Sequence, residues 1–120
     1  MPERKAIAAS DLALLDPGGA FRSRLAEDRA AVAALARKLR QAAPAARPRR
    51  LAEIELLAHR LAGAAGTFGH PAVSAAALEL EDRIARWRKP AGSHARRGPV
   101  ERGLAILAAA LDDALRGEAR

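Results

Sequence analysis

The feature that most constrains the fold is an apolar residue that recurs every three or four positions in four separate stretches. This spacing places apolar side chains on one face of an α-helix, whereas a half-buried strand needs strict alternation, which no stretch sustains. The stretches are Phe21, Leu25, Val32, Leu35 and Leu39; Leu51, Ile54, Ala58, Leu61, Ala65 and Phe68; Val73, Ala76, Ala77, Leu80, Ile84 and Trp87; and Val100, Leu104, Leu107, Leu111 and Leu115. We therefore expect an all-α protein whose four amphipathic helices share one core.

Proline and glycine separate these stretches. Pro44 follows the first, Gly69 and His70 divide the second from the third, and Gly98 and Pro99 open the fourth. Short connections join antiparallel neighbours in helix bundles. The sequence therefore predicts an antiparallel up-down four-helix bundle.

The bundle is expected over residues 20–116 of a single domain that covers residues 1–120. Residues 1–19 then form an N-terminal extension. Ser10 is a suitable N-cap for a short extra helix there, and the run from Asp16 to Gly19 would end it.

The composition excludes several kinds of site. The chain contains no cysteine, so it has no disulfide, thiolate nucleophile or cysteine-based zinc site. His59 and His70 lack the i, i+4 spacing of a helical metal pair, and no metal site is predicted. The apolar runs are too short to span a bilayer, and Ser10 and Asp11 interrupt any secretory signal. We expect a cytoplasmic protein that does not enter the membrane.

The charge leaves one alternative function open. The formal net charge is +7, and the clusters Arg47-Pro48-Arg49-Arg50 and Arg96-Arg97 make a small basic nucleic-acid-binding protein conceivable. Against it, the chain has only two Phe and one Trp to stack on bases, and it shows no recognisable DNA-binding motif. Nucleic acid is therefore not the expected partner.

One histidine in the second stretch has unusual neighbours. Gly63 and Gly66 follow His59 at four and seven positions, on the same helix face. A glycine inside a helix costs about 1 kcal/mol relative to alanine, so the pair indicates a purpose other than helix stability. By helical rotation, His59 points about 130° away from the centre of the apolar stripe, toward solvent. The nearby Leu56 is apolar and points outward as well, which is typical of a docking surface.

These residues resemble the motif of the histidine-containing phosphotransfer (HPt) domain. The family pattern is His-x-Leu-Lys-Gly, then small residues, then a glycine six positions beyond the first; this chain has His59-Arg60-Leu61-Ala62-Gly63 and then Gly69. The run Ala65-Gly66-Thr67-Phe68-Gly69 is similar to the phosphotransfer domains of chemotaxis kinases. Leu80-Glu81 resembles the Leu-Glu pair on the family's next helix. The bundle pattern extends the similarity over residues 20–116.

The resemblance implies that His59 is the phosphoacceptor, exchanging a phosphoryl group with receiver-domain aspartates in two-component phosphorelay signalling. It assigns the attack to Nε2 of the imidazole. Glu81 on the next helix would orient the ring, and Glu55, four positions earlier, is a second candidate to accept the ring N–H. The expected receiver-docking residues are Gly63, Gly66, Leu56, Ala62 and Arg60.

The implied protein is a phosphoryl carrier and not an autonomous catalyst, because the sequence shows no nucleotide-binding glycine loop and no kinase site. Its expected partners are a response-regulator receiver domain, a hybrid histidine kinase, or both. It would need no cofactor of its own, and the receiver domain would bring Mg²⁺.

The chain departs from the family at one position. Ala62 replaces the lysine that would offer a cation to the phosphoryl oxygens. Arg60 cannot take its place, since adjacent helical residues diverge by about 100°. Arg83, Arg86 and Arg88 on the next helix are the other candidates. The departure keeps a second alternative open, a phosphorylation-independent HPt-like scaffold that binds a receiver or kinase.

Overall fold

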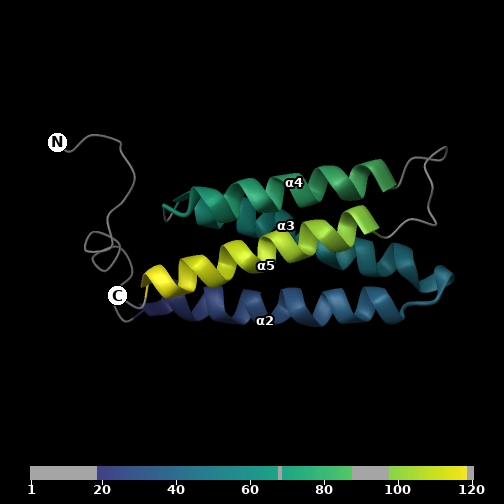
Figure 1. Cartoon of the computed structure of the whole chain (residues 1–120), viewed down its shortest axis with the longest axis horizontal. Helices are drawn as coiled ribbons and strands as arrows, with labels where there is room; N and C mark the ends of the chain where they lie inside the picture. Colours follow the sequence, from purple (N-terminus) through teal and green to yellow (C-terminus); the bar gives the residue numbers. More distant parts are fainter. Residues whose placement is uncertain (1–18, 68, 88–97, 119–120) are drawn as a thin grey trace.

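The computed structural model describes residues 19–67, 69–87 and 98–118, and this part of the chain forms four α-helices and no strand. The helices are α2 (Ala20–Gln41), α3 (Arg47–Thr67), α4 (Pro71–Trp87) and α5 (Gly98–Glu118), with a short 3-10 helix η2 (Pro44–Ala46) between α2 and α3. Figure 1 shows them side by side with their long axes nearly aligned. The predicted all-α class with four helices is confirmed. None of the described helices is long and apolar enough to cross a membrane.

The extra N-terminal helix and the up-down order of the four helices remain predictions. The short extra helix expected from Ser10 falls outside the described residues. The up-down order of the whole bundle stays a prediction, although α3 and α4 themselves do run in opposite directions. Their contacts pair His59 with Glu81 and Ala62 with Ser74, so the residue numbers rise along α3 and fall along α4.

Glycine and proline set the helix ends where the sequence places them. Gly19 precedes α2 with a φ of 76°, a left-handed conformation that glycine adopts without steric cost. Pro71 is the first residue of α4, where its missing N–H would have had no partner within the helix. Gly69 has a φ of 79° and lets the chain reverse between α3 and α4.

Each helix packs against two neighbours. The contacts between α3 and α4 are the most extensive, α4 also packs on α5, and α2 packs on both α5 and α3. It follows that α3 and α5 lie diagonally opposite one another. On one side, the face of α3 that carries His59 therefore borders α4 and no other described helix.

The core is built from the predicted stripes. Its largest fully enclosed side chains are Leu25, Leu39, Ile54, Leu61, Leu80, Ile84, Leu104, Leu107, Leu111, Val32, Val73 and Val100. Burying one such side chain stabilises the fold by about 1.5–3 kcal/mol. Leu35 and Leu115, two members of the stripes, are only partly buried, and Leu57, which the stripes omit, is buried. Phe68 lies outside the described residues.

The interface between α4 and α5 is tightly closed at Gly103. A Cβ atom there would lie 2.9 Å from Cδ1 of Leu80 and 3.1 Å from Cδ of Arg83, so the interface has no room for a larger residue. Arg83 crosses the same interface, because its Nη1 donates to the carbonyl oxygen of Pro99 at 3.0 Å. α4 is therefore held firmly against α5 on the side away from α3.

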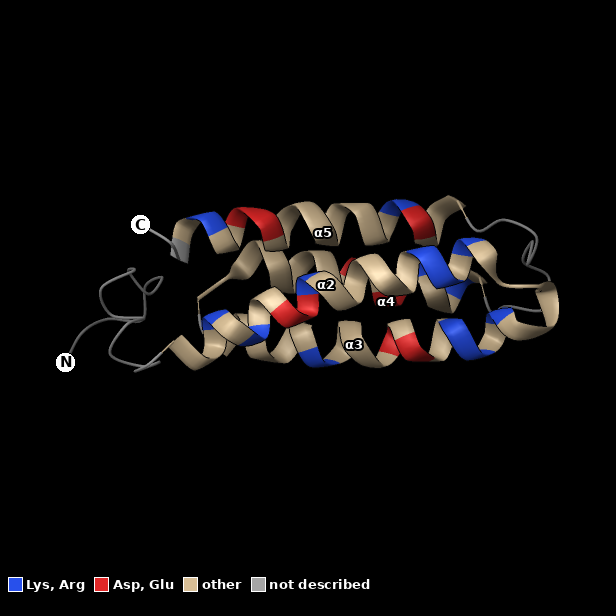
Figure 2. Cartoon of the chain, turned by 90° about the horizontal axis from the view of Figure 1, so that it is seen from below, with Lys and Arg blue, Asp and Glu red and all other residues tan. Residues whose placement is uncertain are grey.

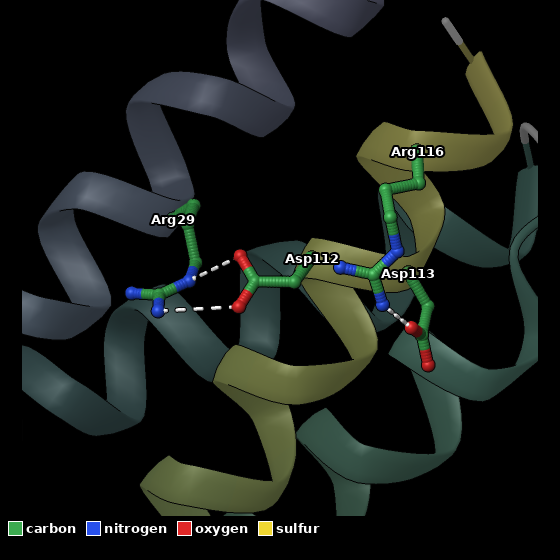
Figure 3. A network of polar contacts seen from close by, with 4 residues as sticks. All are labelled: Arg29, Asp112, Asp113 and Arg116. Carbon is green, nitrogen blue, oxygen red and sulfur yellow. Dashed lines mark hydrogen bonds and ion pairs between the residues drawn. The ribbon is translucent and has the colours of Figure 1, made fainter. Parts of the chain in front are cut away.

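An ion pair joins α2 to α5 (Figure 3). Arg29 donates to both carboxylate oxygens of Asp112, at 2.8 and 3.3 Å, and the neighbouring Asp113 pairs with Arg116 on the same helix. The hydrogen bond from Arg29 holds the pKa of Asp112 below its usual value. Both side chains are partly exposed to solvent, so the pair contributes only modestly to stability.

Candidate functional site

His59 stands on the outer surface of α3, and 80% of its side chain is exposed. Its orientation follows from helical geometry, because Ala58 before it and Leu61 after it are buried in the core. The ring therefore projects away from the core, as the rotation of the apolar stripe predicts. An imidazole in this position can meet another macromolecule without any rearrangement of the fold.

Glu81 on α4 holds one nitrogen of that ring. Its Oε2 lies 3.2 Å from Nδ1 of His59, and its side chain is only 23% exposed. A carboxylate accepts hydrogen bonds, so the neutral tautomer that fits this contact carries its proton on Nδ1 and its free lone pair on Nε2. The ring nitrogen that is not bonded to Glu81 is therefore Nε2.

The surroundings of His59 on α3 are small and apolar. Gly63 and Gly66 share its face, and a Cβ atom added at Gly63 would meet nothing within 4 Å. Leu56, one turn earlier, is 71% exposed. Within the described residues, no packing contact explains the missing side chain at Gly63 or the outward leucine.

α4 continues this surface. Leu78 lies three positions before Glu81 and four after Ser74. Both of those side chains bond to α3, so all three residues share the edge of α4 that borders α3. Leu78 is 56% exposed. We define the α3–α4 face as the surface made by two sets of residues. They are Leu56, His59, Ala62, Gly63 and Gly66 of α3 and Ser74, Leu78 and Glu81 of α4.

Ser74 is a member of this face that the sequence reasoning missed. Its Oγ donates to the carbonyl oxygen of Ala62 at 2.8 Å, which ties the first turns of α4 to the backbone of α3 just beyond His59. A Cβ atom at Gly66 would lie 3.7 Å from the same Oγ, an ordinary contact distance. The sequence did contain one sign of this contact, because Ser74 lies two helical turns before Glu81 and therefore on the same side of α4.

Arg60 points away from the α3–α4 face, although the sequence placed it among the docking residues. Its Nη2 and Nη1 donate to the two carboxylate oxygens of Asp28 on α2, at 2.9 and 3.4 Å. Asp28 is only 4% exposed and interrupts the apolar stripe of α2. A buried carboxylate is tolerated only when it is paired, and Arg60 supplies that pairing.

The arginines of α4 are directed elsewhere as well. Nε of Arg83 donates to Glu79 at 3.1 Å, on the flank of α4 that faces α5. Arg86 pairs with Asp82 one turn earlier on its own helix. Arg88, the third candidate from the sequence, lies outside the described residues.

The other polar residues that the sequence pointed to do not lie together in the fold. Glu55 is partly buried on α3, one turn before His59. His70 precedes α4, where its ring stacks on Phe21 with centroids 5.7 Å apart, while His94 lies outside the described residues. No group of three or more His, Cys, Asp or Glu that could hold a metal ion occurs in the described part of the chain.

The basic residues of the described helices do not gather on one surface. Figure 2 shows Lys and Arg on α2, α3 and α5, interspersed with Asp and Glu. Within the first basic cluster, Arg50 is paired with Glu53 at 2.9 Å, and this hydrogen bond lowers the pKa of Glu53. The second cluster, Arg96 and Arg97, falls outside the described residues.

Comparison with known families gives one result. The family model described as the Hpt domain matches residues 20–117, which include α2, α3, α4, all but the last residue of α5, and the whole α3–α4 face. Comparison with curated proteins and with solved structures gave no match.

Proposed function

The chain belongs to the Hpt domain family, and we propose that His59 is the residue through which it carries a phosphoryl group. At the level of the family, the function is histidine phosphotransfer in phosphorelay signalling, in which Hpt domains interact with receiver domains and histidine kinases. In our proposal the four helices follow one another in up-down antiparallel order. His59 exchanges the phosphoryl group with the aspartate of a receiver domain.

The observation that carries this proposal is the contact between His59 and Glu81. With the proton held on Nδ1, the lone pair of Nε2 attacks the phosphorus of an aspartyl phosphate. The N–P bond forms as the O–P bond breaks, and the aspartate leaves as a carboxylate. The ring becomes a phosphorylated imidazolium, whose positive charge faces the carboxylate of Glu81. No proton has to move during the transfer.

The same contact serves the reverse step. A ring that keeps its proton on Nδ1 leaves phosphorus as neutral imidazole, a better leaving group than the imidazolate anion. Phosphoryl transfer depends on positioning and charge stabilisation more than on covalent assistance. Glu81 supplies the positioning from this chain, and the receiver domain is expected to supply Mg²⁺.

The α3–α4 face supplies the docking surface in this proposal. Gly63 leaves clearance beside His59, and Leu56 and Leu78 offer exposed apolar contacts on either side of the ring. Apolar surface that a monomer leaves exposed is typical of a binding site. A receiver domain seated here would cover the imidazole and exclude water from the transferring group.

Direct chemical phosphorylation tests the assignment without a partner protein. Phosphoramidate should phosphorylate the purified chain, and the label should be acid-labile and base-stable, as a phosphohistidine is. His59→Gln should abolish the ³¹P signal and leave the thermal unfolding temperature unchanged. His70→Gln is the matched control and should keep the label.

A phosphotransfer screen against receiver domains of the same organism then identifies the partner. Label that persists in His59→Gln would reject the assignment of the phosphoacceptor. A chain that binds a receiver domain but takes no label from phosphoramidate would instead be the phosphorylation-independent scaffold, the alternative that Ala62 supports.

A further inference from the structure

The helix that carries His59 offers no cation on the same face. The positions of α3 that share this face are Ala52, Glu55, Leu56, Ala62, Gly63 and Gly66, and none of them is basic. Ala62 lies three positions after His59 and borders α4, since the carbonyl of Ala62 accepts the hydrogen bond from Ser74. A long basic side chain at that position would reach the phosphoryl oxygens, and the methyl group of alanine does not.

The described arginines of α3 and α4 nearest to His59 are committed to other partners. Arg60 is bonded to the buried Asp28 on the flank of α3 that faces α2. Arg83 bonds Glu79 and the carbonyl of Pro99 on the flank of α4 that faces α5. Arg86 is paired with Asp82. A chain with a net charge of +7 thus directs these cations away from its candidate reactive residue.

This arrangement bears on the free energy of the phosphorylated state. The phosphoryl group on Nε2 carries two negative charges near neutral pH, and a nearby cation would lower its free energy. Glu81 compensates the charge of the ring and not that of the phosphoryl oxygens. Among the described side chains of α3 and α4, none supplies a cation to those oxygens.

We propose that Ala62 makes His59 a strong phosphoryl donor, so that the transfer equilibrium is shifted from this chain toward the receiver aspartate. The inference rests on the proposed function and concerns the direction of transfer. The balanced step is phosphohistidine plus aspartate carboxylate giving neutral histidine plus aspartyl phosphate, with the N–P bond broken and the O–P bond formed. The matching partner is a receiver domain whose own site supplies the positive charge around the transferring phosphoryl group.

The test measures the phosphohistidine free energy directly. Phosphoramidate and the chain exchange a phosphoryl group, giving phosphohistidine and ammonia, and ³¹P NMR gives the equilibrium constant before hydrolysis intervenes. Ala62→Lys should raise this constant about fivefold, the effect of one exposed cation on a doubly charged group. Since the free energy of the phosphohistidine enters every transfer equilibrium, the same shift applies to any receiver.

Two matched variants separate local charge from other causes. Ala109→Lys adds the same charge at an exposed position of α5, diagonally across the bundle, and Ala62→Gln adds length without charge. The gain in Ala62→Lys should also disappear in 1 M salt, where the Debye length falls to about 3 Å. An equal gain in either control, or none in Ala62→Lys, would overturn the inference.

The outcomes distinguish this inference from the proposed function. If His59 takes no phosphoryl group from phosphoramidate, the assignment of His59 fails and the equilibrium cannot be measured at that residue. If wild type and Ala62→Lys are phosphorylated at His59 with the same equilibrium constant, the assignment of His59 stands and the donor bias is wrong.

Discussion

Gly63 and Gly103 both lie inside helices, and their surroundings differ completely. At Gly103 an added Cβ atom would collide with Leu80 and Arg83 across the interface between α4 and α5. At Gly63 the same atom would meet nothing within 4 Å. Gly103 is required by the packing of the bundle. Gly63 weakens its helix, and no contact in the described part of the chain explains it, which supports the docking role that we propose for it.

The same contrast separates the two sides of α4. Toward α5 its residues are enclosed, and Arg83 bridges to the backbone of the next helix. Toward the open edge beside α3, Leu78 is left exposed and Glu81 reaches the ring of His59. One side of the helix therefore serves stability, and the other side holds the proposed phosphoacceptor beside an exposed apolar surface.

The largest expected loss of stability comes from filling the closed side. Gly103→Val should reduce the free energy of unfolding by about 2–3 kcal/mol, because the added methyl groups force Leu80 and Arg83 out of their packed positions. Urea denaturation would measure the change. Wild-type stability in this variant would mean that α4 and α5 can separate at little cost, and the contrast with Gly63 would be lost.

A side chain added at Gly63, on the open side of the bundle, should impair transfer and leave stability intact. Gly63→Gln should slow transfer to and from a receiver domain by about 10- to 100-fold, roughly the 1.4–2.7 kcal/mol expected when a side chain obstructs an interface. Its stability should equal or exceed that of wild type, because glycine is replaced in a helix without steric conflict. Phosphorylation by phosphoramidate, which needs no docking, is the internal control. Unchanged transfer would place the docking surface elsewhere.

The flank of α3 toward α2 is expected to behave as structure and not as part of the site. Asp28→Asn should lower the free energy of unfolding by about 1–2 kcal/mol, less than for a fully buried pair since the side chain of Arg60 is 45% exposed. Phosphorylation of His59 should be unaffected at temperatures where the variant is folded. A loss of transfer without a loss of stability would return Arg60 to the docking surface.

Glu81→Gln tests the positioning of the ring. The rate of phosphorylation by phosphoramidate should fall about tenfold, the effect of losing one hydrogen bond to a charged group. The ¹⁵N shifts of His59 should show a larger fraction of the tautomer protonated on Nε2. Glu79→Gln, on the other flank of α4, is the matched control and should leave both measurements unchanged. A normal tautomer ratio in Glu81→Gln would contradict the role proposed for the carboxylate.

The smallest effect is expected at the partly exposed ion pair of Arg29 and Asp112 in Figure 3. The pKa of Asp112 is lowered chiefly by the hydrogen bond from Arg29, so the pair stabilises the fold above the ordinary pKa of 3.8. That contribution is lost as the pH falls through the lower pKa of the folded state. Asp112→Asn should therefore reduce the Tm slightly at pH 7, and the difference from wild type should vanish in strong acid. A difference that persists there would show that charge is not its cause.

The sequence determined the four helices, most of the core and the direction of the candidate histidine. All three follow from a local rule, because a fixed rotation per residue decides which side chains share a face. The same rule found Glu55, Leu56, Gly63 and Gly66 around His59. The shared family pattern added Glu81, a residue on another helix that helical rotation alone could not bring to the ring.

Only the tertiary structure decided which groups meet across helices. It paired Arg60 with the buried Asp28, joined Ser74 to the backbone of α3, and closed the interface at Gly103 while leaving Gly63 open. These contacts depend on the register and separation of neighbouring helices, which the packing of whole side-chain layers sets. A periodic sequence pattern identifies the buried face of each helix, but it does not give the register in which two helices pack against each other.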